Sequence, residues 1–187
     1  RPMSSLEASG VLPDADDYWH DTVRKRSIWG NLMAGGSGTV FFFGVNYPNN
    51  DLDCEDWRSR DHFWDLMRYA HEFFTRWLPF AEMRHADYLS SSPDDFVLAK
   101  PGEAYAIYLP DGGTADLDLA GAGGNFEVRW YDPRHGGELQ TGSVATVAGG
   151  ARRNLGQAPR DPLADWAILV RRPAGETGSF TPPPAPY

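Results

Sequence analysis

The stretch from Ser92 to Arg172 constrains the fold of this chain most, because it has the pattern of one small antiparallel β domain. Short runs of strand-forming residues recur at roughly 8–12-residue spacing and are separated by turns rich in glycine and proline. The runs are Phe96–Ala99, Ala104–Leu109, Ala115–Leu119, Phe126–Tyr131, Val144–Val147 and Trp166–Val170. This pattern predicts a two-sheet antiparallel β-sandwich.

The part of the chain before Ser90 has a different pattern. From about His20 to Ala34, apolar residues recur at helical spacing, and a glycine-rich turn follows. We expect Arg24, Lys25 and Arg26 to lie on the exposed side of this helix.

A short apolar run, Thr39–Phe43, then predicts a strand buried on both faces, as in parallel sheets. The long polar loop Gly44–Trp57 comes next, and a second amphipathic helix is predicted over Ser59–Trp77. Together these elements make one and a half units of a β/α barrel. A single parallel strand has no partner in this sequence, so we expect the chain to be part of a longer protein.

The predicted fold class is therefore multi-domain. Residues 1–90 would form the C-terminal end of a (β/α)8 barrel, an incomplete α/β unit. Residues 91–172 would form the all-β antiparallel sandwich, and residues 173–187 a proline-rich tail.

Charge and composition exclude several classes of partner. The formal net charge is −9 and is divided almost evenly between the two halves of the chain. With no basic patch, neither nucleic acid nor an anionic membrane is an expected partner, and no apolar run is long enough to cross a bilayer. The single cysteine, Cys54, precludes an internal disulfide, and we expect its thiol to be inert.

Four segments resemble a known pair of domains. Ile28–Gly38 and Tyr47–Asp61 resemble the end of the (β/α)8 barrel of apiosidase-like glycoside hydrolases. Lys100–Pro110 and Phe126–Arg134 resemble the module that follows that barrel, the collagen-binding-type domain of a collagenase. The resemblance covers about residues 10–172. It implies the C-terminal part of a bacterial glycoside-hydrolase-like protein that is secreted or periplasmic.

The barrel resemblance implies a substrate-binding loop, because barrel enzymes gather their site residues on the loops that follow the strands. The loop Gly44–Trp57 carries groups that suit a sugar: amides and a carboxylate for hydroxyls, and aromatic rings for stacking. The candidate residues are Tyr47, Asn49, Asn50, Asp51 and Trp57. The alternative is that residues 49–51 form a turn and that Trp57 fills the top of the barrel.

A metal site is the other alternative for the same loop. Asp51, Asp53 and Glu55 alternate, which could suit calcium, but the loop lacks the glycine and the final glutamate of an EF-hand. The histidines show no metal-binding spacing either. We therefore expect no metal and no cofactor.

Glycoside hydrolysis needs two carboxyl groups that flank the scissile bond. Glu7 is the candidate for the second, late carboxyl, and its alternative is an exposed loop glutamate. The acid that follows a middle barrel strand would lie upstream of residue 1. We therefore expect this fragment to be inactive alone.

Three functions remain open. The first is hydrolysis of a complex polysaccharide by the parent protein, with a glycan as partner. The second is binding of carbohydrate or extracellular matrix, collagen included, by the sandwich. The third is a brace, in which the sandwich packs on the barrel. Exposed aromatics gathered on one sandwich face would favour binding.

Overall fold

The computed structural model describes residues 3–5, 19–39, 61–173 and 175. Two long helices precede the sandwich, and each changes from one helical form to another without a break. The helical segments are η1 (Val23–Trp29), α1 (Gly30–Met33), α2 (Asp61–Glu72), η3 (Phe73–Trp77), η4 (Phe80–Glu82) and η5 (Asp87–Leu89). No helix in the described part of the chain is both long and apolar enough to cross a bilayer.

Both predicted helices are confirmed within the described residues. The first is continuous through η1 and α1, and the second through α2 and η3. Phe63, Leu66 and Ala70 are buried on α2 at the three- and four-residue spacing that places side chains on one helix face. The exposed position predicted for Arg24 is wrong, since that side chain is buried against the sandwich.

A parallel strand pair lies beside the first helix. β1 (Met3–Ser5) pairs in parallel with β2 (Gly36–Thr39). The expectation that the predicted strand lacks a parallel partner is therefore wrong. β2 begins three residues before the predicted strand, and residues 40–43 lie outside the described residues. These two strands and the long helices, called here the helical unit, do not form a barrel within the described residues.

The sandwich is confirmed as an antiparallel β structure with two sheets. The larger sheet has the order β3-β4-β5-β10-β7-β8, and the smaller one is the pair β6-β9. The strands are β3 (Arg84–His85), β4 (Phe96–Lys100), β5 (Ala104–Leu109), β6 (Thr114–Asp118), β7 (Asn125–Tyr131), β8 (Thr146–Ala148), β9 (Arg152–Gln157) and β10 (Trp166–Arg171).

Five of the six predicted strands match within one residue at each end. The run Val144–Val147 becomes β8, which begins two residues later. Two strands, β3 and β9, were not predicted. The latter pairs with β6 to complete the smaller sheet.

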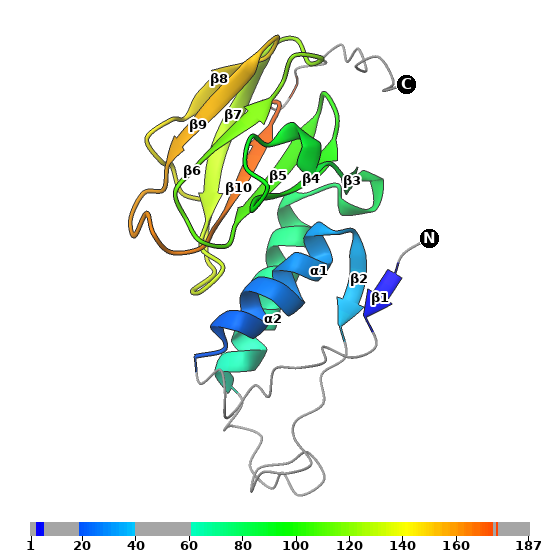
Figure 1. The fold of residues 1–187 in the computed structure, drawn as a ribbon, viewed down its shortest axis with the longest axis vertical. Coiled ribbons are helices and arrows are strands. Elements are labelled where there is room, and N and C mark those ends of the chain that lie inside the picture. Colours follow the sequence, from blue (N-terminus) through cyan, green and yellow to red (C-terminus); the bar gives the residue numbers. More distant parts are fainter. Residues whose placement is uncertain (1–2, 6–18, 40–60, 174, 176–187) are drawn as a thin grey trace, which may run out of the picture.

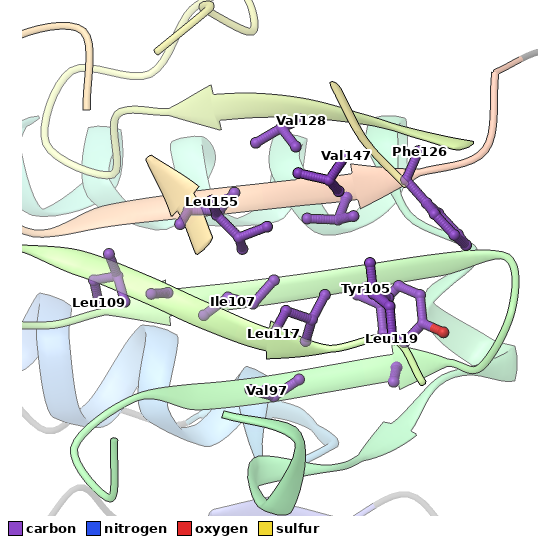
Figure 2. Packing of buried hydrophobic residues seen from close by; sticks show 14 of the residues in the cluster. Val97, Tyr105, Ile107, Leu109, Leu117, Leu119, Phe126, Val128, Val147 and Leu155 are labelled. Carbon is purple, nitrogen blue, oxygen red and sulfur yellow. The ribbon is translucent and has the colours of Figure 1, made fainter. Parts of the chain in front are cut away.

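The central strands of the larger sheet are buried on both faces. In β5, Tyr105, Ile107 and Leu109 point into the core between the sheets (Figure 2). Ala106 and Tyr108 point the opposite way, into a second core formed with the helices. Such alternation follows from the two-residue repeat of a strand.

The molecule therefore has three layers. The small sheet covers one face of the six-stranded sheet, and the helical unit covers part of the other (Figure 1). The core on the helical side contains large side chains from both helices, and it continues into β5, β7 and β10. The two predicted domains thus share one apolar core, while their division at residue 90 stays a prediction.

Candidate functional site

Both long helices begin at the end of the helical unit toward which β2 points (Figure 1). Gly36, at the start of β2, lies against Asn31. Thr39, at its end, donates a hydrogen bond to the carbonyl of Ser27 at 3.2 Å. The strand therefore runs back along the helix toward the helix start. In parallel α/β folds, site residues gather at the carboxyl ends of the strands.

Two indoles and two imidazoles mark this end, which we call the strand-end face. Trp19 is 69% exposed and Trp64 is 46% exposed. The Nε2 atom of His62 lies 3.2 Å from the Trp19 carbonyl oxygen, and the rings of His20 and His62 lie 5.5 Å apart. An exposed indole offers a flat apolar face and a polar N–H. Sequence reasoning did not single out Trp19 and Trp64, because neither belongs to a motif.

The predicted site residues are in segments that the structure does not describe. Glu7 lies outside the described residues, as do Tyr47, Asn49, Asn50, Asp51 and Trp57. The same holds for Cys54 and for the acidic residues weighed as calcium ligands. Among the residues that the structure describes, no group of three or more potential ligands could hold a metal ion.

A buried ion pair joins the helical unit to the sandwich. Arg24 Nε donates to Asp165 Oδ2 at 2.9 Å, and Arg24 Nη2 donates to Oδ1 at 2.8 Å. The Tyr108 hydroxyl donates to the same carboxylate at 2.9 Å. All three side chains are nearly inaccessible to solvent. The fork-to-fork geometry is the strong form of such pairs, and it fixes orientation as well as distance.

The pKa shifts at this pair follow from burial and charge. Burial alone would lower the pKa of Arg24, but its hydrogen bonds and the charges of Asp165 and Asp21 outweigh this effect, so the pKa is raised. Burial raises the pKa of Tyr108 well above its ordinary value, and the charge of Asp165 adds to the shift. Arg24 therefore stays charged and Tyr108 stays protonated as a hydrogen-bond donor.

Aromatic rings fill the rest of this junction. The Trp29 ring stacks on Tyr108 with a centroid distance of 5.1 Å, and Phe73 lies 5.1 Å from Tyr131. The Tyr131 hydroxyl donates to the Tyr69 carbonyl at 2.9 Å. Burial raises the pKa of Tyr131, so this donor is also retained. Ring contacts and a hydrogen bond therefore join the sheet to the helices here.

A second buried carboxylate organises the far end of β7. Asp132 is fully buried and accepts hydrogen bonds from the Arg134 side chain at 2.9 Å and from Arg160 at 3.0 Å. His135 Nδ1 lies 3.0 Å from the same carboxylate. Burial would raise the pKa of Asp132, but its hydrogen bonds prevail and lower the pKa to about 2. Through Asp132, these hydrogen bonds connect the turn after β7 to the loop before β10.

Comparison with known families and structures agrees with this architecture. Residues 88–171 match a family model described as "Putative collagen-binding domain of a collagenase". No curated protein matches the chain. The matched segment corresponds to the sandwich and leaves out the two long helices.

Two solved structures share the fold at low sequence identity. A glycoside hydrolase family 5 protein from Bacteroides vulgatus ATCC 8482 aligns with 84% of this chain at 16% identity and a TM-score of 0.63. A structure named as a glycoside hydrolase aligns with 94% of this chain at 14% identity and a TM-score of 0.68. This chain spans 37% and 43% of those two chains. The shared fold extends beyond the sandwich into the helical unit.

Proposed function

We propose that this chain is the C-terminal part of a glycoside-hydrolase-type protein that acts on a complex polysaccharide outside the cytoplasm, and that its β-sandwich braces the helical unit. The fold shared with two glycoside hydrolases supports the first part of this proposal, and the shared core carries the brace. Trp29, Phe73 and Phe74 of the helices pack with Tyr108 and Tyr131 of the six-stranded sheet. Each large apolar side chain contributes about 2 kcal/mol when buried, so the junction stabilises both parts.

The exposed residues of the sandwich also favour a brace over a binding module. Binding surfaces usually gather large apolar side chains in one exposed patch. Among the described residues, the exposed large hydrophobics of the sandwich region are Tyr88, in η5, and Leu163, in the loop before β10. They come from separate segments. Retention on collagen or on a polysaccharide by the sandwich alone is therefore the alternative against which the brace is tested.

Mutation of the buried ion pair tests the brace. In Asp165→Asn, Arg24 keeps its buried charge and its contact with the exposed Asp21 but loses the buried opposite charge, which should cost about 3 kcal/mol of unfolding free energy. The matched control is Asp161→Asn, on the same loop, whose carboxylate is 59% exposed and lies 3.6 Å from Arg134. Urea unfolding would be followed by far-ultraviolet circular dichroism and by tryptophan fluorescence.

The brace predicts that Asp165→Asn shifts both signals together to lower urea, while Asp161→Asn leaves them near the parent. Equal, small effects of the two variants would contradict it. Retention of the chain on a collagen or polysaccharide column, with no stability loss in Asp165→Asn, would favour the binding alternative.

We place the glycan site of the parent protein at the strand-end face. Glu7 follows β1 by two residues, and the loop with Asn49, Asp51 and Trp57 follows β2. Because the two strands are parallel neighbours, their carboxyl ends meet at one edge. Tyr47 and Asn50 belong to the same proposed set.

Glutamate and tryptophan variants of the whole protein test this placement. Glu7→Gln should lower kcat by at least about 100-fold if Glu7 reacts as the second carboxyl. Trp57→Ala should mainly raise KM for a polysaccharide substrate. The control is Glu82→Gln, whose carboxylate is exposed and pairs with Lys100. Full activity of Glu7→Gln would exclude Glu7 as a catalytic residue. The proposal that the sandwich is a brace would still stand.

A further inference from the structure

A polar groove runs along the seam between the first helix and the sandwich. Its volume is about 490 Å³, which lies within the ~300–1,000 Å³ of most small-molecule sites. The helix supplies Asp21, Thr22, Lys25 and Arg26 to one wall. The sandwich supplies the opposite wall, from the segment before β4 and from the turn after β5.

We propose that this seam groove binds a neutral segment of a polysaccharide chain, as a subsite separate from the strand-end face. The inference rests on the proposed function, because it assumes a glycan partner. It goes beyond a brace, because the junction between helix and sandwich would also bind a ligand.

Two of the groove's charged groups are held in place by the fold. Asp21 forms an ion pair with Arg24 Nη1 at 2.7 Å. Arg24 is itself held by the buried carboxylate of Asp165. Lys25 Nζ lies 3.5 Å from Asp111 Oδ1, so this pair links the helix to the turn after β5. A ligand would therefore meet two groups, Asp21 and Lys25, that already have ion-pair partners before it binds, which lowers the entropic cost of binding.

The pattern of charge favours a neutral polyhydroxyl ligand over an ion. The groove is lined both by the carboxylates of Asp21, Asp94 and Asp111 and by the cations of Lys25 and Arg26. A polyanion would meet three carboxylates and a polycation two cationic side chains. A sugar hydroxyl both donates and accepts hydrogen bonds, so it can satisfy both kinds of group.

An aromatic ring adds an apolar element to the groove. Phe96 lines the groove, is only partly buried, and stacks on Tyr108 with a centroid distance of 6.3 Å and an interplanar angle of 23°. Its ring is therefore fixed against the junction core. A fixed ring beside hydroxyl-binding groups suits a sugar ring, which has apolar C–H faces and a polar rim.

The location links the groove to the strand-end face. Asp21 is two residues from the exposed Trp19, so the groove opens near the end where the parallel strands finish. A polysaccharide that occupies the strand-end face could continue along the seam. The subsite would then favour long substrates over short ones.

Oligosaccharide titrations of the 187-residue chain test the proposal. Unbranched neutral pentose and hexose oligosaccharides would be titrated and followed by amide chemical shifts and calorimetry, with an oligogalacturonate as the anionic comparison. At least one neutral oligosaccharide should shift the amides of Thr22, Arg26 and Asp94. Arg26→Ala and Asp94→Ala, both exposed in the free chain, should each weaken binding about tenfold, as expected for the loss of a hydrogen bond to a charged group.

The matched control is Arg68→Ala, an exposed arginine of α2 that pairs with Asp65 outside the groove. Its affinity should equal that of the parent chain. The proposal is overturned if no neutral oligosaccharide shifts these amides, if the groove variants bind like the parent, or if only the anionic oligomer binds. None of those outcomes changes the unfolding of Asp165→Asn, so failure of the subsite and failure of the brace are distinguishable.

Discussion

Arg24 and Asp132 keep their charges although they are buried, because each has several partners in fixed positions. Asp165 binds one guanidinium and one hydroxyl, and Asp132 binds two guanidinium groups. A buried charge without such partners would be destabilising.

At the scale of single residues the sequence carries little information about such contacts. Nothing in the run from Pro162 to Asp165 shows that its last residue meets a helix 141 positions away.

The pKa of Asp132 gives a pH-dependent prediction. In the folded chain this pKa lies near 2, below its ordinary value of 3.8. The ionised group therefore stabilises the fold above about pH 4, and this contribution of about 2 kcal/mol is lost as the pH falls toward 2. Asp132→Asn should be less stable than the parent at pH 7, and the gap should narrow in that acidic range. Urea unfolding at several pH values measures the difference in unfolding free energy between the parent and Asp132→Asn. A difference that does not change with pH would contradict the assigned pKa.

Local patterns predicted most elements, and the failures have physical reasons. The helix α2 has strong apolar periodicity, and β5 is a continuous apolar run bounded by turn residues, so the existence of both follows from the sequence. β9 was missed because Arg152, Arg153 and Asn154 show no apolar alternation, with Leu155 as its one large buried residue. It becomes a strand through pairing with β6, which is a tertiary effect on weak local preference.

The turn between α1 and β2 gives a prediction at the element scale. A Cβ atom at Gly36 would lie 2.8 Å from the Asn31 carbonyl oxygen and closer still to the Asn31 side chain. Gly36→Ala should therefore lower the free energy of unfolding by about 1–3 kcal/mol. The control is Gly38→Ala in the same strand, where an added Cβ meets nothing within 4 Å. Thermal melts would compare them, and equal melting temperatures would show that β2 shifts freely.

At the scale of the whole molecule, the sequence correctly indicated a sandwich attached to an α/β unit, but not how the two meet. Which sheet face the helices cover depends on Tyr108, Tyr131 and Leu169, which read as ordinary strand residues. The loop Gly44–Trp57 is expected to line a site because it follows a predicted strand, and this stays a prediction because the loop lies outside the described residues. No sequence pattern indicates that Trp19 and Trp64 lie at the strand-end face, since their position follows from the packing of the two helix starts.

The central claim is that helices and sandwich form one cooperative unit. Native-state hydrogen exchange in low urea measures it most directly, by giving an opening free energy for each amide. We expect the amides of Phe73–Trp77 and those of Tyr105–Leu109 to share the same opening free energy and the same dependence on urea. Exchange of the helical amides through a separate opening several kcal/mol lower, with the sandwich still closed, would contradict the brace.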